Sequence, residues 1–471
     1  MHWYRFCVDL FETIPEARFS PLHFKYLDQL PHYANLSANW PGPFFRSCIF
    51  IYRALRDADF SVQFRSQCLQ DTEVLIFANS KNQMAAVEKI EWSLSCNGKN
   101  TTIAGFLPQP NRNVTDSAYS KILISLADVS KAVILLMRRY RRLKKALGGA
   151  QDPRCRSFFD VFLSAYLYAP VFLKYLTSLR PKLVLVANDH NTCNRALIAV
   201  ANQLGIKTAY VQHAHVTGLF PPLAVDYAFL DGKLAASVYY GTEKENSDLS
   251  AFSGASHVFL TGALKGIPER SSSRQVLTRR YRRVGIAVNL LTDSSILSAL
   301  CGVLLSHNFT IVLRPHPGMN QDTVDQLVAT LDLNSMSGSA ASLDKAGVKQ
   351  FFDSIDVLIA GNSSIVLEGA LTGLPVIQYF SMDLIKSDYY NFSRNGIARS
   401  AADPQDVLHN IEKLGSNWRP LRKSVLHAYS STYGTDSQGK ECEVVATNIE
   451  SLIAGESPNE LFGYETTIVR K

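Results

Sequence analysis

The sequence feature that most constrains the fold is a pattern that occurs three times between residues 283 and 378. The three copies read RVGIAVNLLTDSSIL, NFTIVLRPHPGMN and DVLIAGNSSIVLEGALTGLPVIQY. In each copy an apolar run typical of a buried strand leads into a polar loop and then an apolar-periodic, helix-like stretch, which is the pattern of a β-loop-α unit. In an open parallel sheet the loops at the carboxyl ends of the strands meet at one edge, where such sheets bind ligands. We therefore expect the loops LTDSS, RPHPG and GNSS to face one crevice.

A second region of the same kind precedes it. Residues 71–94 read as strand, turn and helix, and residues 181–216 read as strand, helix and strand, with Gly205 as the helix terminator. Further strands are expected over 225–230 and 257–261. The pattern predicts an α/β protein with two doubly wound Rossmann-like domains that face each other across a cleft. The predicted ranges are an N-terminal extension over 1–70 with a helix near 46–57, a first domain over 71–262, a linker over 263–283, a second domain over 284–435, and a C-terminal helix that crosses back, with a tail, over 436–471.

Composition agrees with a globular protein of this size. The 471 residues are 46% hydrophobic and 19% charged, which excludes disorder and collagen-like order. The eight cysteines show no CxxC or CxxxH spacing, so neither a disulfide framework nor a zinc site is expected, and we predict that no metal or cofactor is required. The first residues lack the order of a secretory signal, which favours the cytoplasm.

The most apolar stretch, 158–176, is interrupted by polar residues and proline and is expected to form a buried helix pair.

A net charge of +7 is too small to argue for nucleic acid but fits an anionic ligand or membrane surface. The densest basic run is Arg138–Lys145, in the sequence MRRYRRLKKALGG. On a helix its basic side chains would lie beside apolar ones, as in helices that bind membrane surfaces. A solvated helix face is the alternative, and the residues do not decide between the two.

The loop RPHPG carries the first group of candidate ligand-binding residues. Arg314 and His316 follow an apolar strand, and the prolines, including Pro317, restrict the backbone around them. An arginine fork and an imidazole held in this way can bind a phosphate.

The loop GNSS carries the second group, at the point where a strand gives way to a helix. Free backbone N–H groups and serine hydroxyls at a helix start favour an anion, and a glycine allows close approach. Glu368, one turn into the helix, could point at the same ligand or at solvent. The candidate residues of this loop are Gly361, Asn362, Ser363, Ser364 and Glu368. In the loop LTDSS, Asp293 is either a general base or a helix cap.

The first domain contributes polar residues after two predicted strands. Asn188, Asp189 and His190 follow VLVA, and Gln212, His213 and His215 follow AYV. A carboxylate or imidazole in either loop could remove a proton from an acceptor hydroxyl. The alternative is that these residues hydrogen-bond to one another across the domain interface.

Taken together, RPHP, GNSS and LEGALTGLPVI resemble the GT-B glycosyltransferases that use cytidine-nucleotide donors, which include sialyl-, polysialyl-, Kdo- and CDP-glycerol transferases of bacterial surface polymers. The stretch around 188–216 is similar to capsule-synthesis proteins with a QHG-like loop, where this chain has Gln212-His213-Ala214. The resemblance implies that His316-Pro317 and Ser363-Ser364 bind a CMP-type nucleotide. The acidic motif of sialyltransferases is incomplete here, with only Leu230-Asp231-Gly232.

The resemblance implies a metal-independent, inverting glycosyltransferase of cell-envelope or capsule polysaccharide biosynthesis. Its partners would be a nucleotide-activated sugar and an oligosaccharide or glycolipid acceptor. Peripheral contact with the inner face of the plasma membrane is expected through the basic run Arg138–Lys145, and nucleic acid is not expected as a partner. Asp189, His213, Asp293 and His316 are the expected catalytic residues. Two alternatives stay open: a UDP-sugar epimerase of GT-B fold, and a non-catalytic, membrane-associated assembly partner.

Overall fold

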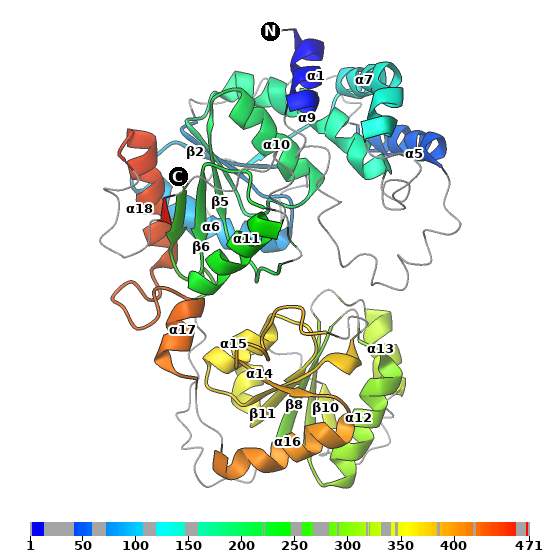
Figure 1. The fold of residues 1–471 in the computed structure, drawn as a ribbon, viewed down its shortest axis with the longest axis vertical. Coiled ribbons are helices and arrows are strands. Elements are labelled where there is room, and N and C mark those ends of the chain that lie inside the picture. Colours follow the sequence, from blue (N-terminus) through cyan, green and yellow to red (C-terminus); the bar gives the residue numbers. More distant parts are fainter. Residues whose placement is uncertain are drawn as a thin grey trace. The chain divides into compact units, whose positions relative to one another are not determined.

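The computed structural model describes two compact units of the chain. The described residues are 2–13, 42–58, 72–106, 119–146, 159–218, 220, 222–245, 257–266, 282–289, 292–316, 319, 321–330, 341–343, 347–383, 387–417, 421–457 and 468–469. Unit 1 comprises Met1–Lys265 and His427–Lys471, and unit 2 comprises Gly266–Leu426 (Figure 1).

Unit 1 is built on an eight-stranded sheet with the order β14-β7-β6-β5-β4-β1-β2-β3. Every pairing is parallel except that of β14 with β7. Four residues of β1 and four of β4 are all buried, as expected where helices cover both faces of a parallel sheet. The strands are β1 (Val74–Phe77), β2 (Thr101–Gly105), β3 (Tyr119–Lys121), β4 (Leu183–Val186), β5 (Lys207–Val211), β6 (Tyr227–Leu230), β7 (His257–Leu260) and β14 (Ile468–Val469).

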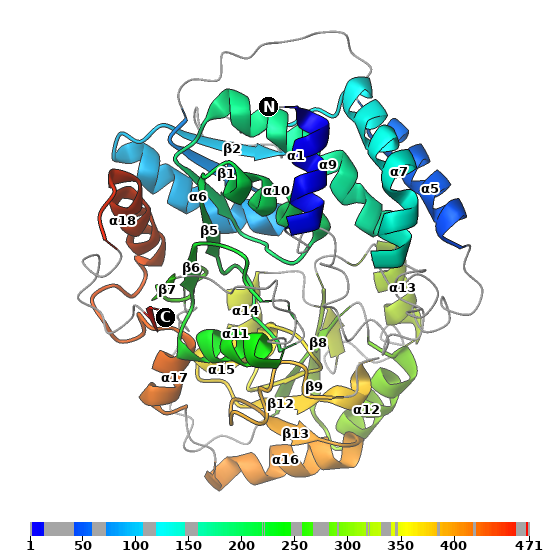
Figure 2. The same ribbon diagram turned by 45° about the horizontal axis from the view of Figure 1, so that its top comes forward.

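The helices of unit 1 cover both faces of this sheet (Figures 1 and 2). They are α1 (Trp3–Thr13), α5 (Pro43–Arg56), α6 (Lys81–Cys96), α7 (Leu126–Ala146), α9 (Phe159–Leu179), α10 (Thr192–Gln203), α11 (Lys233–Glu245) and α18 (Glu441–Ala454), while α17 (Lys423–Tyr429) spans the boundary between the units. Gly205, with a φ of +71°, follows α10 as the predicted terminator.

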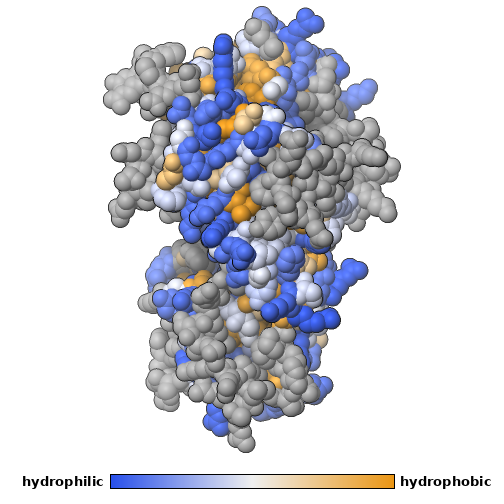
Figure 3. All heavy atoms as spheres, turned by 90° about the vertical axis from the view of Figure 1, so that its left-hand side faces the viewer, coloured by the Kyte–Doolittle hydropathy of each residue, from blue (hydrophilic) through white to orange (hydrophobic). Residues whose placement is uncertain are grey.

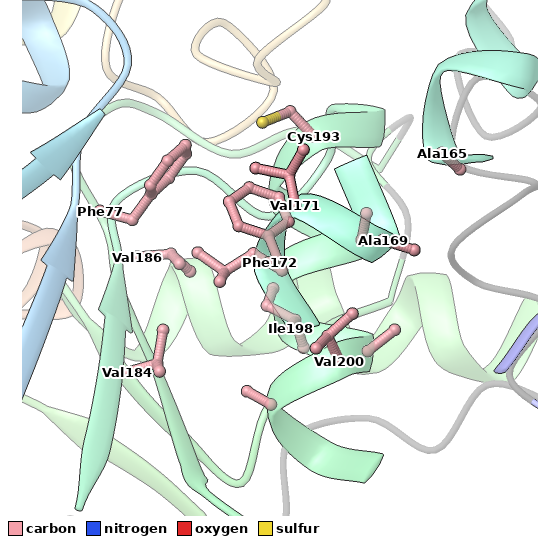
Figure 4. Packing of buried hydrophobic residues seen from close by; sticks show 14 of the residues in the cluster. Phe77, Ala165, Ala169, Val171, Phe172, Val184, Val186, Cys193, Ile198 and Val200 are labelled. Atoms are coloured by element: carbon pink, nitrogen blue, oxygen red, sulfur yellow. The ribbon is translucent and has the colours of Figure 1, made fainter. Parts of the chain in front are cut away.

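One face of the sheet packs against α9 and α10. Phe172 of α9 meets Phe77 of β1 edge to face at 5.7 Å between ring centroids, beside Val186 of β4 (Figure 4). The stretch predicted as a helix pair is the single helix α9, which continues through Pro170. It is the one described helix long and apolar enough to cross a membrane, but 67% of its most apolar window is buried in unit 1. This burial makes α9 a core helix.

The other face packs against α6 and α18. Ile449 and Leu452 of α18 are fully buried with Val87 and Ile90 of α6. The C-terminal segment therefore completes the core of unit 1. On the face drawn in Figure 3, hydrophobic residues lie among hydrophilic ones.

The first 58 residues also contribute to unit 1. The helix predicted near 46–57 is α5, and Phe6 of α1 and Phe50 of α5 are buried in the same core as α9. Asp160 of α9 binds α5 through Arg46 Nη1 at 3.1 Å and Arg53 Nη1 at 2.6 Å. These helices are therefore part of the unit 1 core.

Unit 2 has a six-stranded, fully parallel sheet with the order β10-β9-β8-β11-β12-β13. Its strands are β8 (Arg283–Val288), β9 (Thr310–Pro315), β10 (Ala341–Leu343), β11 (Val357–Ala360), β12 (Val376–Tyr379) and β13 (Arg399–Ala401). Its helices are α12 (Ser294–Ser306), α13 (Gln321–Thr330), α14 (Val348–Ser354), α15 (Ile365–Leu371), the 3-10 helix η4 (Phe380–Met382) and α16 (Pro404–Asn417).

When the six strands of unit 2 are numbered by their order in the chain, they lie in the sheet in the order 3-2-1-4-5-6. The strands β1 to β6 of unit 1 lie in the same order, β3-β2-β1-β4-β5-β6. This is the order of doubly wound dinucleotide-binding folds, in which the ligand crevice opens where the order reverses. The prediction of two doubly wound Rossmann-like α/β domains is confirmed for each unit.

Candidate functional site

In unit 2 the three predicted loops follow three adjacent strands. The order reverses between β8 and β11, and β9 lies on the other side of β8. Val288 of β8 pairs with Pro315 of β9, and Ala287 pairs with Ala360 of β11, so the three strands end at one edge of the sheet. The loops that begin at Asn289, His316 and Gly361 therefore lie together at the switch point.

Asp383 joins two of these loops. Its side chain has no exposed surface and accepts hydrogen bonds from Asn289 Nδ2 at 3.0 Å, from Thr292 Oγ1 at 3.4 Å and from the backbone N–H of Asn362. Burial raises the pKa of Asp383, and these hydrogen bonds partly oppose the rise. Sequence reasoning missed this residue. The available signal was its position just after β12, at the same sheet edge.

Gly361 has a reason to be glycine that the sequence did not reveal. A Cβ atom at this position would overlap the carboxylate of Asp383. Asn362 is also occupied within the protein, since its Nδ2 donates to Ser387 O at 2.9 Å and its Oδ1 accepts from Tyr389 N at 3.1 Å. These two residues shape the loop.

The two serines of GNSS differ in their contacts. The Ser363 hydroxyl makes no hydrogen bond with any described residue, and its side chain is partly exposed. Ser364 precedes α15 without capping it through its side chain, and its hydroxyl donates to Glu368 Oε1 at 3.4 Å. Ser363 is thus the hydroxyl of this loop best placed to bind a ligand, while Glu368 contacts Ser364.

At the end of β9, Arg314 and His316 take different positions. The Arg314 guanidinium lies over the ring of Phe351, 5.5 Å from its centroid, which fixes the direction of the side chain. His316 is exposed, and partial desolvation lowers its pKa. Its carbonyl accepts from Met319 N at 2.9 Å. Pro317 lies outside the described residues.

Asp293 is the N-cap of α12. Its Oδ1 accepts from Ser295 N at 2.9 Å, Ser295 Oγ at 2.6 Å and Ile296 N at 3.4 Å. Of the two roles considered from the sequence, these contacts favour the cap, because the carboxylate is already engaged by the helix it begins.

In unit 1 the residues after β4 form a buried ionic cluster. Asp189 has no exposed surface and lies 3.4 Å from Arg195 Nη2 and 3.5 Å from His190 Nδ1. The backbone N–H of His190 donates to Asn188 Oδ1 at 3.0 Å, and the imidazole stacks on Phe220 at 4.5 Å. The carboxylate is thus enclosed and paired with Arg195, and its expected role as the base stays a prediction. Asp189 lies beside His190 in this cluster, and its hydrogen bond goes to Arg195 Nη2.

The residues after β5 are more enclosed than the sequence suggested. Gln212 is buried and accepts from Asp231 N at 3.0 Å. Burial lowers the pKa of His213 to about 4, with smaller contributions from His190 and Lys265, and burial lowers the pKa of His215 to about 4 as well. Both imidazoles are neutral at pH 7 and can accept hydrogen bonds, but such low pKa values make them weak bases.

Asp231, at the end of β6, is the carboxylate of unit 1 whose surroundings best fit proton transfer. Desolvation raises its pKa well above the ordinary value; Glu441 also raises it, and Lys265 has the opposite effect. Its side chain is partly exposed, and its carboxylate makes no hydrogen bond with any described residue. Desolvated carboxylates at strand ends are typical of acid–base catalysis. The sequence signal was the Asp-Gly pair directly after an apolar strand.

Two further observations concern cofactors and metals. Within the described ranges, no group of three or more His, Cys, Asp or Glu side chains is arranged to hold a metal ion. The six cysteines that lie in these ranges are all free thiols.

Comparison with known proteins gives likeness of fold only. No protein-family model matches the chain, and no curated protein matches it. Similar solved structures include a UDP-GlcNAc 2-epimerase from Neisseria meningitidis, with 11% identity over 81% of this chain and 99% of its own and a TM-score of 0.45. MurG from Acinetobacter baumannii has 10% identity over 80% of this chain and 99% of its own, with a TM-score of 0.45. A glycosyltransferase from Rickettsia africae has 8% identity over 82% of this chain and 100% of its own, with a TM-score of 0.47.

Proposed function

We propose that this chain is a glycosyltransferase that moves a sugar or polyol phosphate from a nucleotide-activated donor to a surface polysaccharide or glycolipid. The observation that carries the proposal is the switch point of unit 2. There the ends of β9 and β11 bring to one sheet edge an arginine, an exposed histidine and a serine hydroxyl that makes no hydrogen bond with the described residues. A nucleotide diphosphate or monophosphate is the ligand class that such an edge binds. The motif resemblance favours cytidine as the base.

In this proposal the donor phosphate lies on the GNSS and RPHP loops. The Ser363 hydroxyl and backbone N–H groups donate to phosphate oxygens, and Arg314 and His316 supply positive charge or hydrogen bonds. These groups stabilise the charge that develops on the leaving nucleotide, so the proposal includes no divalent metal. Asp383 supports this site by holding the loops after β8 and β11 together.

On the acceptor side the proposal assigns the base to Asp231 rather than Asp189 or Asp293. A carboxylate with a raised pKa, whose oxygens accept no hydrogen bond from the described residues, can take the proton of an attacking hydroxyl. With a sugar donor, direct attack of the acceptor hydroxyl on the donor carbon releases the nucleotide and inverts the configuration of that carbon. We place the enzyme in the cytoplasm, with the basic helix face of Arg138–Lys145 at the membrane where a glycolipid acceptor would lie.

The deciding experiment is thermal unfolding with CMP, CDP and UDP. Stabilisation by a cytidine nucleotide alone supports the proposal, because a ligand that binds the folded state raises its melting temperature. A response to UDP but not to CMP or CDP would favour the epimerase. No response to any nucleotide would favour the non-catalytic assembly partner.

His316→Ala is the matching variant. We expect it to lose most of the nucleotide response and to reduce transfer by about 100-fold, the scale of one lost donor at a developing charge. His307→Ala is the control, since His307 follows α12 and precedes β9 and therefore lies at the opposite edge of the sheet. Equal nucleotide responses in the two variants would contradict the assignment of the site.

A further inference from the structure

The helix α5 has apolar residues on both of its long faces. Arg46, Ser47, Phe50 and Ala54 are buried against the rest of unit 1. On the other side, Phe44 is 75% exposed, Phe45 55% and Tyr52 67%, and Leu55 is exposed as well. Phe44, Tyr52 and Leu55 are spaced by eight and three residues, so they lie on one stripe of the helix.

This exposure is concentrated at one place on the described surface. Of the eight large apolar side chains that are exposed in the described ranges, seven lie on α5, on α7 or just before α7. The exception is Trp92 on α6. The two helices are side by side in Figures 1 and 2. Contiguous exposed apolar side chains mark an interaction surface more often than scattered ones do.

The exposed face of α5 is held in place by the protein. Asp160, with 2% side-chain exposure, binds Arg46 Nη1 at 3.1 Å and Arg53 Nη1 at 2.6 Å. The pair with Arg46 is itself buried, since the Arg46 side chain is 4% exposed. Because this clamp fixes the helix from its inner side, the aromatic side chains project from a rigid support.

The neighbouring helix α7 carries the positive charge. Its sequence holds seven basic residues and one acidic residue, which is +6 of the +7 net charge of the whole chain. Met137, Arg141 and Lys144 are exposed and lie four and three residues apart, on a single stripe. Apolar and basic side chains therefore share one outward face of α7.

We propose that α5 and α7 form a docking surface for an anionic lipid bilayer. This lipid-docking surface consists of Phe44, Phe45 and Tyr52 of α5 with Met137, Arg141 and Lys144 of α7. The aromatic side chains enter the headgroup region, where amphipathic rings are favoured, and the long basic side chains reach lipid phosphates. The excess of one charge sign selects a bilayer over a second copy of the chain, because two such surfaces would repel each other. The inference rests on the membrane contact in the proposed function and adds α5 to it.

The test is co-sedimentation of the full-length protein with vesicles. Vesicles of phosphatidylcholine mixed with phosphatidylglycerol should retain the protein, and vesicles of phosphatidylcholine alone should retain much less. The Phe44→Ser/Phe45→Ser variant should bind the anionic vesicles about tenfold more weakly or worse, because two exposed aromatic side chains no longer enter the bilayer. The Arg141→Gln/Lys144→Gln variant should bind the anionic vesicles about tenfold more weakly or worse. Added salt should weaken binding of the wild type to these vesicles.

Two matched controls keep the result specific. Trp92→Ser removes an aromatic side chain of similar exposure from α6, and Arg422→Gln/Lys423→Gln removes two exposed charges near α17. Both should bind the vesicles as the wild type does. All variants should keep the thermal response to CMP or CDP, which also shows that they fold.

Three results would overturn the inference. They are equal binding of the wild type to neutral and anionic vesicles, wild-type binding by Phe44→Ser/Phe45→Ser, and self-association of the wild type that only this variant abolishes. Vesicle binding without any nucleotide response would leave the docking surface in place and reject the proposed enzyme function.

Discussion

Asp383 and Gly361 depend on each other at the centre of the candidate donor site. The carboxylate fills the space that a side chain at position 361 would need, and it accepts hydrogen bonds from the loops after β8 and β11. A buried acceptor that is removed leaves its donors without partners, at about 1–3 kcal/mol for each group. The pair therefore fixes the shape of the loops before any ligand binds.

We expect Gly361→Ala to destabilise unit 2 by about 1–3 kcal/mol, because the added methyl group overpacks the site. In an Asp383→Ala background, Gly361→Ala should destabilise unit 2 much less, because the carboxylate that overlaps the new methyl group is absent. Chemical denaturation of the two single variants and the double variant gives the coupling energy. Additive costs would show that the two residues do not share this contact.

We expect the carboxylate of Asp231 to lower the stability of the folded protein while serving as the base in transfer. Its folded-state pKa lies above the unfolded value, so the unfolded chain releases its proton at a lower pH than the folded chain. Stability therefore falls as pH rises from the unfolded pKa through the folded pKa, and the loss is complete above both. A neutral amide at this position avoids that loss.

Asp231→Asn should accordingly lower transfer by about 100-fold to 10,000-fold, the usual contribution of a general base. Its melting temperature at pH 8 should equal or exceed that of the wild type, and the difference should shrink at acidic pH. Transfer assays and unfolding across pH check both parts. A variant that is inactive and less stable at pH 8 would indicate a structural role instead.

At the scale of elements, the ion pairs of Asp160 attach α5 to α9. The carboxylate lies in the first turn of an apolar helix and binds two arginines 114 and 107 residues away in the sequence. Breaking a buried pair from one side is costly because the remaining charge has no partner.

Asp160→Asn should destabilise unit 1 by about 3–5 kcal/mol, since it leaves the Arg46 guanidinium buried beside a neutral group. Asp57→Asn is the control: it removes the partner of Arg56 from an exposed pair and should cause no measurable change. Unfolding in urea provides the comparison. If the two variants were equally stable, the Asp160 clamp would not hold α5.

At the scale of the whole molecule, the chain returns from unit 2 to complete unit 1. The segment His427–Lys471 belongs to unit 1, and α18 buries Val445, Ile449 and Leu452 against the face of the sheet that α6 covers. Each unit therefore has its own core, while only unit 2 is continuous in sequence.

Ile449→Ala should lower the free energy of unfolding of unit 1 by about 2–5 kcal/mol, because it leaves a cavity in the core. Thr447 is exposed, so Thr447→Ala should change this free energy little. Because the cores are separate, the thermal response of unit 2 to a cytidine nucleotide should be unchanged in both variants. Calorimetry with and without CMP measures both quantities. A lost nucleotide response in Ile449→Ala would show that the two cores do not unfold independently.

The hydrophobic periodicity of the sequence was enough to place most helices and strands and the loops after β8, β9 and β11. This is because the periods of a helix and a strand depend on residues that are neighbours in the sequence. The same pattern placed Ser363, His316 and Asp293 at strand ends, since the carboxyl ends of parallel strands share an edge. It failed where a helix continues through Pro170, because packing within the core outweighs the local preference.

What only the tertiary structure decided is the environment of each charged or aromatic group. Asp189 is enclosed by Arg195, Asp231 is desolvated, Asp383 fills the space beside Gly361, and Phe44 is exposed on a clamped helix. Apart from the pair of Asp189 with Arg195, these environments are made by residues more distant in the sequence. Desolvation and charge pairing depend on distances in space, so the sequence determined where the polar loops lie and the fold determined which of their side chains are available for chemistry.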